Sequence, residues 1–235
     1  MRHDGRKNNE IRPITVERGF IQSADSSVLI SFGQTRVICT ATLERGVPRF
    51  LRDTGHGWVT AEYAMLPAST SERIRRDSQK GKISGRSMEI QRLIGRSLRS
   101  VIDLQALGEQ SIMIDCDVIQ ADGGTRTTSI TGAMIVLRDL IHQMMANGTL
   151  THNPIQSVIA AISLGIVDGE VMVDLDYQED SSAQVDLNLV MTNDGRFIEI
   201  QGTAEQSPFT GQQMAQFLAL GQPSIESIIT KVMPH

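Results

Sequence analysis

The stretch QADGGTRTTSITGA, residues 120–133, combines the groups that an anion-binding site needs. Gly123 and Gly124 lack a Cβ, so their amide groups can approach an oxyanion closely. The helix expected from Thr125 onward directs unpaired N–H groups and partial positive charge at the same point, and Thr125 can cap it and donate its hydroxyl. Arg126 adds a planar guanidinium that binds two phosphate oxygens at once. These residues predict a phosphate site; the alternative is a plain glycine turn before a helix, with Arg126 in solvent.

A second stretch, GKISGRS at residues 81–87, has the same cationic, glycine-punctuated character at the start of an expected helix. It is not a P-loop, because its glycine spacing is one residue short and Arg86 stands where that motif has lysine. Two cationic helix starts in one small protein predict that Arg86 and Arg126 converge on a single phosphate.

Carboxylates dominate the segment between residues 168 and 186, which contains no basic residue. Most of them are expected on turns and solvated strand faces. Asp186 is expected on a strand face that it shares with Asn188, and Asp180 on the loop that leads to this strand. Two carboxylates at the mouth of a sheet can hold Mg²⁺, or one can be kept protonated by its neighbour and act as a general acid.

Residue types disfavour several other classes of site. The five histidines show no metal-ligand spacing, and neither a GxSxG motif nor a Cys/His pairing is present. Aromatic residues make up 4% of the chain, which argues against base stacking of the RRM or OB type. Cys39 and Cys116 lie in apolar, strand-like runs without CxxC spacing, so we expect buried free thiols in a reducing cytosol.

Length and hydropathy bound the architecture. The chain has 235 residues, 40% of them hydrophobic, which is enough for one substantial core or two small ones. No apolar stretch approaches the ~20 residues that cross a bilayer, and the first ten residues lack the apolar segment of a signal peptide. We therefore expect a cytoplasmic protein without a membrane segment.

The net charge of −5 conceals an asymmetry between the two parts of the chain. Residues 1–100 carry 18 Lys and Arg against 10 Asp and Glu, whereas the remainder carries 4 against 17. Either a polyanion meets the first part and a cation the second, or the two parts attract each other within the fold or an oligomer.

Apolar periodicity predicts the elements that must position these residues. Runs typical of an antiparallel, turn-connected sheet lie at 13–20, 27–32, 36–43 and 57–63. Later strands are expected at 111–119, 157–167, 171–176, 184–192 and 197–203, with hairpin turns at Asp168-Gly169 and Asp194-Gly195. Helices are expected at 86–107, at about 125–145 and at about 210–231. This alternation predicts an α+β fold, and the lack of linker composition predicts a single domain over residues 1–235.

Cations gather in two further places. The segment 68–85 is polar and glycine-containing, which is typical of a long loop, and carries Arg73, Arg75, Arg76 and Lys80. Arg92, Arg96 and Arg99 fall on one face of the helix that follows, opposite an apolar stripe. Both groups can contact an RNA backbone, although the helix arginines can instead pair with acidic neighbours.

Longer motifs are more specific than these spacings. They are RHDGRK, GVPRF, GWVTAEYAMLP, GRSMEIQRLIGRSLR, DCDVIQADGGTRTTSITGA, DLDYQEDSSAQVDLN and DGRFIEIQGTAE. Together they resemble the bacterial ribonuclease PH family over nearly the whole chain, a family that includes polynucleotide phosphorylase and the ring subunits of the exosome.

The resemblance implies a phosphate-dependent 3′→5′ exoribonuclease that trims tRNA precursors and other RNA 3′ ends and releases nucleoside diphosphates. It implies a homohexameric ring, a trimer of dimers, and a sandwich of mixed sheets and helices like that of a ribosomal protein. The family's phosphate ligands match Arg86, Gly124, Thr125 and Arg126 of this sequence. Its essential carboxylates match Asp180 and Asp186, with Mg²⁺ as the implied metal.

The match has departures. Ala68 stands where the family usually has an arginine that contacts tRNA, which puts the strength of the tRNA contact in doubt. Two rival functions stay open: a hydrolytic metallonuclease whose anion site holds the RNA's own phosphate, and a catalytically silent ring subunit that only binds RNA. The silent subunit predicts loss of the arginine or aspartate set, and both sets are present.

Overall fold

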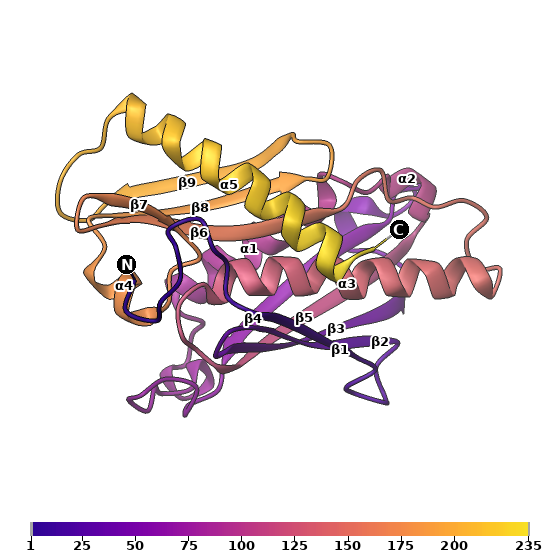
Figure 1. Ribbon diagram of the computed structural model, residues 1–235. Coiled ribbons are helices and arrows are strands. Elements are labelled where there is room, and N and C mark those ends of the chain that lie inside the picture. The colour runs from indigo at the N-terminus through magenta and orange to yellow at the C-terminus, as the bar shows by residue number, and fades with distance from the viewer. Residues whose placement is uncertain (1, 235) are drawn as a thin grey trace.

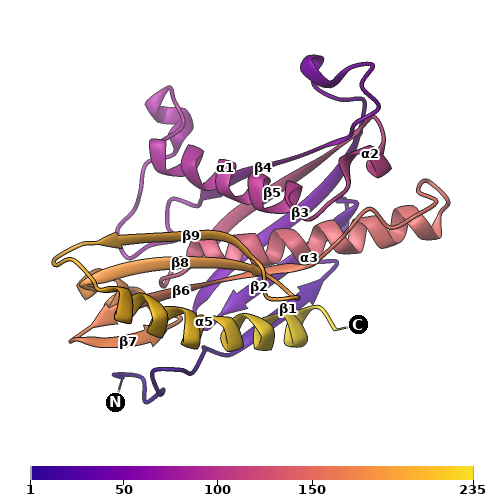
Figure 2. The same ribbon diagram turned by 90° about the horizontal axis from the view of Figure 1, so that it is seen from above.

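A computed structural model describes residues 2–234, apart from the side chains of Ser78 and Lys80. Two β-sheets lie on either side of the long helix α3 (Thr125–Ala146) (Figure 1). Helix α1 (Gly85–Arg99) packs beside α3 and against the first sheet, whereas α5 (Gly211–Val232) packs on the second sheet (Figure 2). The α+β class expected from the sequence is confirmed.

The first sheet has the strand order β1-β2-β3-β5-β4. Its strands are β1 (Ile14–Arg18), β2 (Ser26–Phe32), β3 (Thr35–Arg45), β4 (Trp58–Met65) and β5 (Gln110–Gln120). The antiparallel arrangement expected for the first four strands is wrong for β4, which pairs with β5 in parallel. Parallel neighbours need a crossover, and the chain supplies one through the loop after β4 and helix α1.

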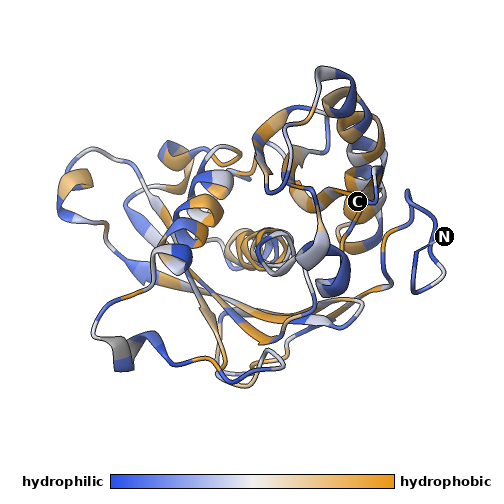
Figure 3. Cartoon of the chain, turned by 90° about the vertical axis from the view of Figure 1, so that its left-hand side faces the viewer, coloured by the Kyte–Doolittle hydropathy of each residue, from blue (hydrophilic) through white to orange (hydrophobic). Residues whose placement is uncertain are grey.

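Helix α3 is buried on both sides. The expected stripe of Ile130, Met134, Leu137, Ile141 and Met144 is buried, and so is most of the rest of the helix. An α-helix that is apolar around its circumference belongs inside a protein, and Figure 3 views α3 nearly end-on between the two sheets. The glycine loop at its N-terminus is therefore carried by the most deeply buried helix of the fold.

The helix expected at 86–107 is in fact two helices. After α1 the chain turns at residues 100–103, where Val101 and Ile102 remain buried. Asp103 then caps α2 (Leu104–Leu107) by accepting hydrogen bonds from the amides of Gln105 and Ala106. A side chain that satisfies helix-start amides in this way favours a new helix over a continuation.

The second sheet has the order β7-β6-β8-β9 and is antiparallel throughout. Its strands are β6 (Ile159–Val167), β7 (Glu170–Val173), β8 (Val185–Thr192) and β9 (Phe197–Ala204). The turns expected at Asp168-Gly169 and Asp194-Gly195 join β6 to β7 and β8 to β9, as predicted. Every residue of β6 is buried, because α3 covers one face of this sheet and α5 the other.

One short helix departs from expectation. Residues 177–182, expected as a loop, form α4 (Tyr177–Ser182), which begins with a capping box between Asp176 and Glu179. Two 3-10 turns, η1 (Arg49–Leu51) and η2 (Asp77–Lys80), interrupt the longer loops. Within the described part of the chain, no helix combines the length and the apolar character needed to span a membrane.

Candidate active site

One cavity of about 270 Å³ lies where the N-terminus of α3 meets the second sheet. It is lined by both predicted anion-binding stretches and by both predicted carboxylates. The lining residues include Arg86, Gly123, Gly124, Thr125, Arg126, Asp180 and Asp186. Residues from α1, α3, α4 and β8, far apart in sequence, therefore share one site.

The glycine loop that leads into α3 is held by three hydrogen bonds with two residues. The Thr35 hydroxyl donates to the carbonyl of Gly123 (2.6 Å) and accepts from the amide of Asp122 (2.9 Å). The Arg12 guanidinium donates to the carbonyl of Asp122. Both Gly123 and Gly124 have positive φ, +71° and +64°, a conformation that side-chain-bearing residues rarely adopt. The loop is thus fixed before any ligand arrives.

Thr125 does not cap the helix, although the sequence allows it to. The N-cap is Gly124, without a side-chain hydrogen bond, and Thr125 is the first helical residue. The hydroxyl of Thr125 instead accepts a hydrogen bond from the buried Tyr63 hydroxyl (2.9 Å). Because Tyr63 acts as the donor, the proton of Thr125 is directed elsewhere, and Thr125 lines the cavity.

The two arginines differ in how they are held. Nη1 of Arg126 donates to Oε1 of Gln201 (2.7 Å), whose amide donates in turn to Glu89 (2.7 Å). The side chain of Arg126 is only 14% exposed, so its position is well defined. Arg86 is exposed, and its guanidinium makes no hydrogen bond or ion pair with the described residues. Arg126 is thus preset and Arg86 is free to close on a ligand.

The two carboxylates of the cavity interact electrostatically. Asp180 is carried by α4 and Asp186 by β8, and both are half-buried. Burial raises the pKa of Asp180, and Arg86 and Arg126 oppose this rise. Burial also raises the pKa of Asp186, and the neighbouring Asp180 raises it further. Such a pair either retains a proton or attracts a cation.

The donor set at Asp180 and Asp186 fits a magnesium ion. The side-chain amide of Asn188 lies 3.5 Å from both oxygens of Asp186, and no other hydrogen bond or ion pair engages the two carboxylates within residues 2–234. Mg²⁺ is commonly bound by one or two carboxylates together with water and substrate phosphates. The open oxygens of Asp180 and Asp186, which share the cavity with Arg86 and Arg126, match that pattern.

Three of the remaining carboxylates, which we expect from the sequence on turns and solvated strand faces, are buried. Asp174, Asp176 and Glu179 are 2–6% exposed. Nε of Arg2 donates to Glu179 (2.7 Å), while Nε and Nη2 of Arg12 donate to the two oxygens of Asp174 (3.0 and 2.7 Å). The interpretation of the charge asymmetry as attraction within the fold is confirmed for these pairs.

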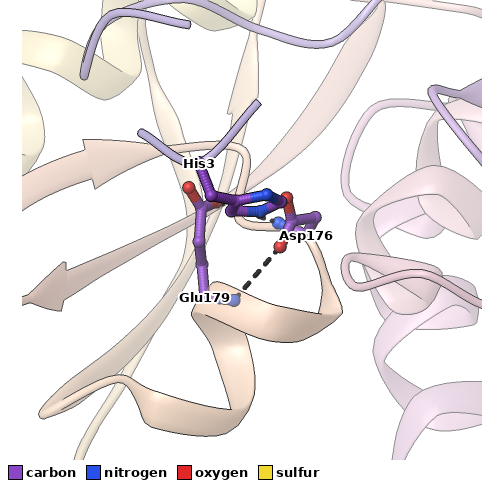
Figure 4. A group of neighbouring side chains, drawn as sticks. All are labelled: His3, Asp176 and Glu179. Carbon is purple, nitrogen blue, oxygen red and sulfur yellow. Dashed lines mark hydrogen bonds and ion pairs between the residues drawn. The ribbon is translucent and has the colours of Figure 1, made fainter. Parts of the chain in front are cut away.

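One group within this network has the composition of a metal site. His3, Asp176 and Glu179 each offer a ligand atom, all within 4.8 Å of one another (Figure 4). Nε2 of His3 is already hydrogen-bonded to Oδ2 of Asp176 (2.6 Å), and Arg2 engages both oxygens of Glu179. The adjacent guanidinium supplies the positive charge that a metal would supply, so we assign the group to ion pairing that fastens the N-terminal segment to α4.

The loop cations lie next to the cavity. Arg75 and Arg76 line a second hollow of about 380 Å³, which shares Met65 and Arg86 with the first. Arg73 is exposed in the same loop, and the side chain of Lys80 lies outside the described residues. None of the three described arginines forms an ion pair within that part of the chain. A cationic path therefore leads to the cavity.

The helix arginines do not form a single exposed stripe. Arg92 and Arg96 line a groove between α1 and β9, where Arg96 pairs with Glu199 (2.9 Å). Arg99 is half-buried over the ring of Trp58 (4.4 Å to the centroid) and donates to the carbonyl of Val59 (2.8 Å). Arg99 is thus engaged with the sheet, whereas Arg92 remains exposed.

Sequence reasoning missed three residues that hold or line the site. Arg12 and Thr35 hold the glycine loop, and Tyr177 lines the cavity. Arg12 lies next to a proline, and Thr35 lies between the strands expected at 27–32 and 36–43, so neither carried a signal of its own. Tyr177 falls within a motif used for the resemblance, but nothing in its spacing indicated a cavity.

Three solved structures with a similar fold come from a plant and from archaea. Rice (Oryza sativa) Rrp46 is 18% identical with a TM-score of 0.78, and the match covers 100% of both chains. An Archaeoglobus fulgidus exosome structure, with RNA bound to the active site, is 18% identical with a TM-score of 0.81, covering 98% of this chain and 92% of that one. An archaeal exosome core is 19% identical with a TM-score of 0.75, covering 98% and 90%.

Family models match most of the sequence. The model described as the 3′ exoribonuclease family, domain 1, matches residues 10–141, and domain 2 of the same family matches residues 157–223. The boundary falls between α3 and β6, although one continuous hydrophobic core includes residues from both matched parts. The chain therefore belongs to the 3′ exoribonuclease family, the ribonuclease PH family that its motifs resemble.

Proposed function

We propose that this protein is a phosphorolytic 3′→5′ exoribonuclease, which uses inorganic phosphate to remove nucleotides from RNA as 5′-diphosphates. The observation that carries the proposal is the single cavity shared by the glycine loop, Arg86, Arg126 and the two carboxylates. An anion site and a carboxylate pair within one cavity of that volume are what a phosphate attacking a phosphodiester needs.

The phosphate is the attacking group in this proposal. The amides at Gly123 and Gly124, the Thr125 hydroxyl and the two guanidinium groups hold it in line with the last phosphodiester of the RNA. A bond forms between a phosphate oxygen and the phosphorus, and the bond to the 3′-oxygen of the preceding ribose breaks. The products are a nucleoside 5′-diphosphate and an RNA one nucleotide shorter, and excess diphosphate drives the reverse reaction.

The departing 3′-oxygen is a poor leaving group and requires a proton or a positive charge. The Asp180 and Asp186 pair is suited to hold that proton, because burial raises both pKa values. Mg²⁺ bound by these carboxylates would stabilise negative charge on the scissile phosphate. Arg126 is held in place by its hydrogen bond to Gln201 and offers the attacking anion a positive charge beside the two carboxylates.

The substrates and the assembly follow from the resemblance. We propose tRNA precursors and other RNA 3′ ends as substrates, with Arg73, Arg75, Arg76 and Lys80 contacting the RNA backbone ahead of the cavity. Arg92 and Arg96 extend the cationic surface along α1, and Arg99 supports that helix. We also propose a homohexameric ring. Among the relatives in solved structures, the Archaeoglobus fulgidus exosome holds RNA in its active site.

An assay of labelled RNA separates this function from its rivals. RNA labelled in its 3′-terminal nucleotide is incubated with and without inorganic phosphate, and diphosphate is resolved from monophosphate. We expect phosphate-dependent release of the diphosphate. Monophosphate release without phosphate would indicate a hydrolytic metallonuclease, and RNA binding without release would indicate a silent subunit. Removal of Mg²⁺ with a chelator should abolish release, and its return should restore it.

A further inference from the structure

Tyr177 is an exposed aromatic residue at the mouth of the catalytic cavity. It is 61% exposed, begins α4, and lines the cavity together with the phosphate-site residues. The only other tyrosine, Tyr63, is buried beneath Thr125. Burying an aromatic ring stabilises a protein. The Tyr177 ring stays exposed beside the proposed reaction site, so its apolar faces are available to a ligand.

The cavity has an apolar portion that its proposed ionic chemistry does not use. Met65, Ala121 and Tyr177 line it beside Arg86, Arg126 and the carboxylates. Phosphate and a scissile phosphodiester need N–H donors, cations and oxygen ligands, and gain nothing from apolar walls. A nucleobase does gain from them, because its faces are apolar and stack on aromatic rings.

The backbone of Tyr177 is fixed with respect to the phosphate loop. Its amide donates to Oδ1 of Asp122 (3.3 Å), the residue just before the two glycines. Its side chain makes no hydrogen bond or aromatic contact with the described residues. Tyr177 is therefore anchored at its backbone, while its ring is free. Tyr177 also lies three residues before Asp180, a spacing that places two side chains on the same side of a helix.

We propose that Tyr177 is the stacking platform for the base of the 3′-terminal nucleotide, the one released as a diphosphate. The inference rests on the proposed function and adds a base contact to it. One short helix then positions the base through Tyr177 and the reacting phosphodiester through Asp180. Stacking ignores base identity, which suits an enzyme that removes each nucleotide in turn.

Paired variants and paired substrates test the contact. Tyr177→Ala, Tyr177→Phe and the neighbouring exposed control Gln178→Ala are assayed on RNA whose last nucleotide either carries a base or is abasic. Base–aromatic stacking contributes ~1–3 kcal/mol, so Tyr177→Ala should raise the KM for RNA roughly 5- to 150-fold while the KM for phosphate stays unchanged. Tyr177→Phe and Gln178→Ala should match the wild type.

The abasic substrate makes the test independent of the variant's folding. The wild type should bind it more weakly by the same factor, and Tyr177→Ala should show no further loss on it. An unchanged KM for base-carrying RNA in an active Tyr177→Ala enzyme would overturn the stacking role, as would an equal loss on both substrates. Failure of the proposed function is a different result, in which the wild type itself releases no diphosphate with phosphate present.

Discussion

Gly123 packs directly against the backbone of Asp176. A Cβ on Gly123 would lie 2.6 Å from the carbonyl carbon of Asp176 and 2.9 Å from its Cα. Gly123 belongs to the glycine loop before α3, and Asp176 is the N-cap of α4, which carries Asp180. The glycine loop, which we propose as the anion site, and the helix that carries Asp180 therefore set each other's position.

Gly123→Ala should disrupt this contact and the phosphate site with it. The new methyl group meets backbone atoms that cannot move independently, and the φ of +71° adds strain. We expect a loss of about 1–3 kcal/mol in the free energy of unfolding and a raised KM for phosphate. Gly148→Ala is the control, because Gly148 has a similar φ of +80° but open space around it. Equal losses in the two variants, measured by urea unfolding, would show that the contact with Asp176 is unimportant.

Arg126→Ala should weaken phosphate binding far more than RNA binding. The guanidinium contributes a charge-assisted hydrogen bond, so we expect the KM for phosphate to rise by roughly 10- to 150-fold, the equivalent of ~1.5–3 kcal/mol. Arg92→Ala is the matched control, since Arg92 is an exposed arginine in the adjacent groove rather than in the cavity. Steady-state kinetics with each substrate varied in turn give both constants. Equal effects of Arg126→Ala on phosphate and RNA would contradict its assignment to the phosphate.

Asp180→Asn should keep RNA binding and lose turnover. The amide preserves the shape of the side chain but cannot hold a metal as a carboxylate does or deliver the same proton. Asp168→Asn is the control, because Asp168 lies exposed in the β6–β7 turn with a φ of +50°, which asparagine adopts readily. RNA binding by fluorescence anisotropy and release of diphosphate are measured on both variants. A normal rate for Asp180→Asn would place the chemistry elsewhere.

The carboxylate pair should lower stability at neutral pH. The folded pKa of Asp186 is raised by burial and by Asp180, so folding favours its protonated form. Stability is therefore lost as pH rises above the unfolded pKa of about 3.9, and no loss occurs well below it. Asp186→Asn removes the charge, so we expect a higher Tm than the wild type at pH 7 and no difference at about pH 3.

Two comparisons check the cause of that difference. The pKa of the exposed Asp194 is lowered by hydrogen bonding to Arg196, so Asp194→Asn should not raise the Tm at pH 7. Mg²⁺ should raise the Tm of the wild type more than that of Asp186→Asn, since a ligand stabilises only the form that binds it. An Asp186→Asn variant no more stable than the wild type at pH 7 would show that burial and Asp180 do not raise the pKa of Asp186 in the folded protein.

Residue type and spacing within single segments of the sequence predicted those parts of the site that lie within one segment. The glycines before α3, the cationic start of α1 and the carboxylates near β8 each lie at the end of an element whose periodicity is clear. Their meeting in one cavity was expected from charge and from the resemblance, and the structure brings them together. Their roles in binding and catalysis stay predictions.

What sequence periodicity did not predict depends on contacts between distant residues. The pairs Arg2–Glu179 and Arg12–Asp174 join residues more than 160 positions apart, and no spacing rule indicates such partners. Helix α4 is short and polar, so its apolar periodicity is too weak to predict a helix, although it begins with a capping box. The parallel pairing of β4 follows from the path of α1 rather than from the composition of the strand.

The Arg2–Glu179 pair gives the last prediction. Both side chains are buried, and Glu179 also accepts from the amide of Asp176 in the capping box of α4. Glu179→Ala leaves the Arg2 guanidinium buried without its carboxylate, so we expect a loss of about 3–5 kcal/mol in the free energy of unfolding. Glu170→Ala, in an exposed position on β7, should change it little.

A double-mutant cycle separates the pair from the rest of the network. Arg2→Ala with Glu179→Ala should lose less than the two single variants combined, because no buried charge then lacks its partner. The turnover rate of Glu179→Ala should also fall at temperatures where it is folded, since the next residue on α4 is Asp180. Additive losses in the cycle, or a normal rate in the folded variant, would show that the N-terminal segment does not position the catalytic helix.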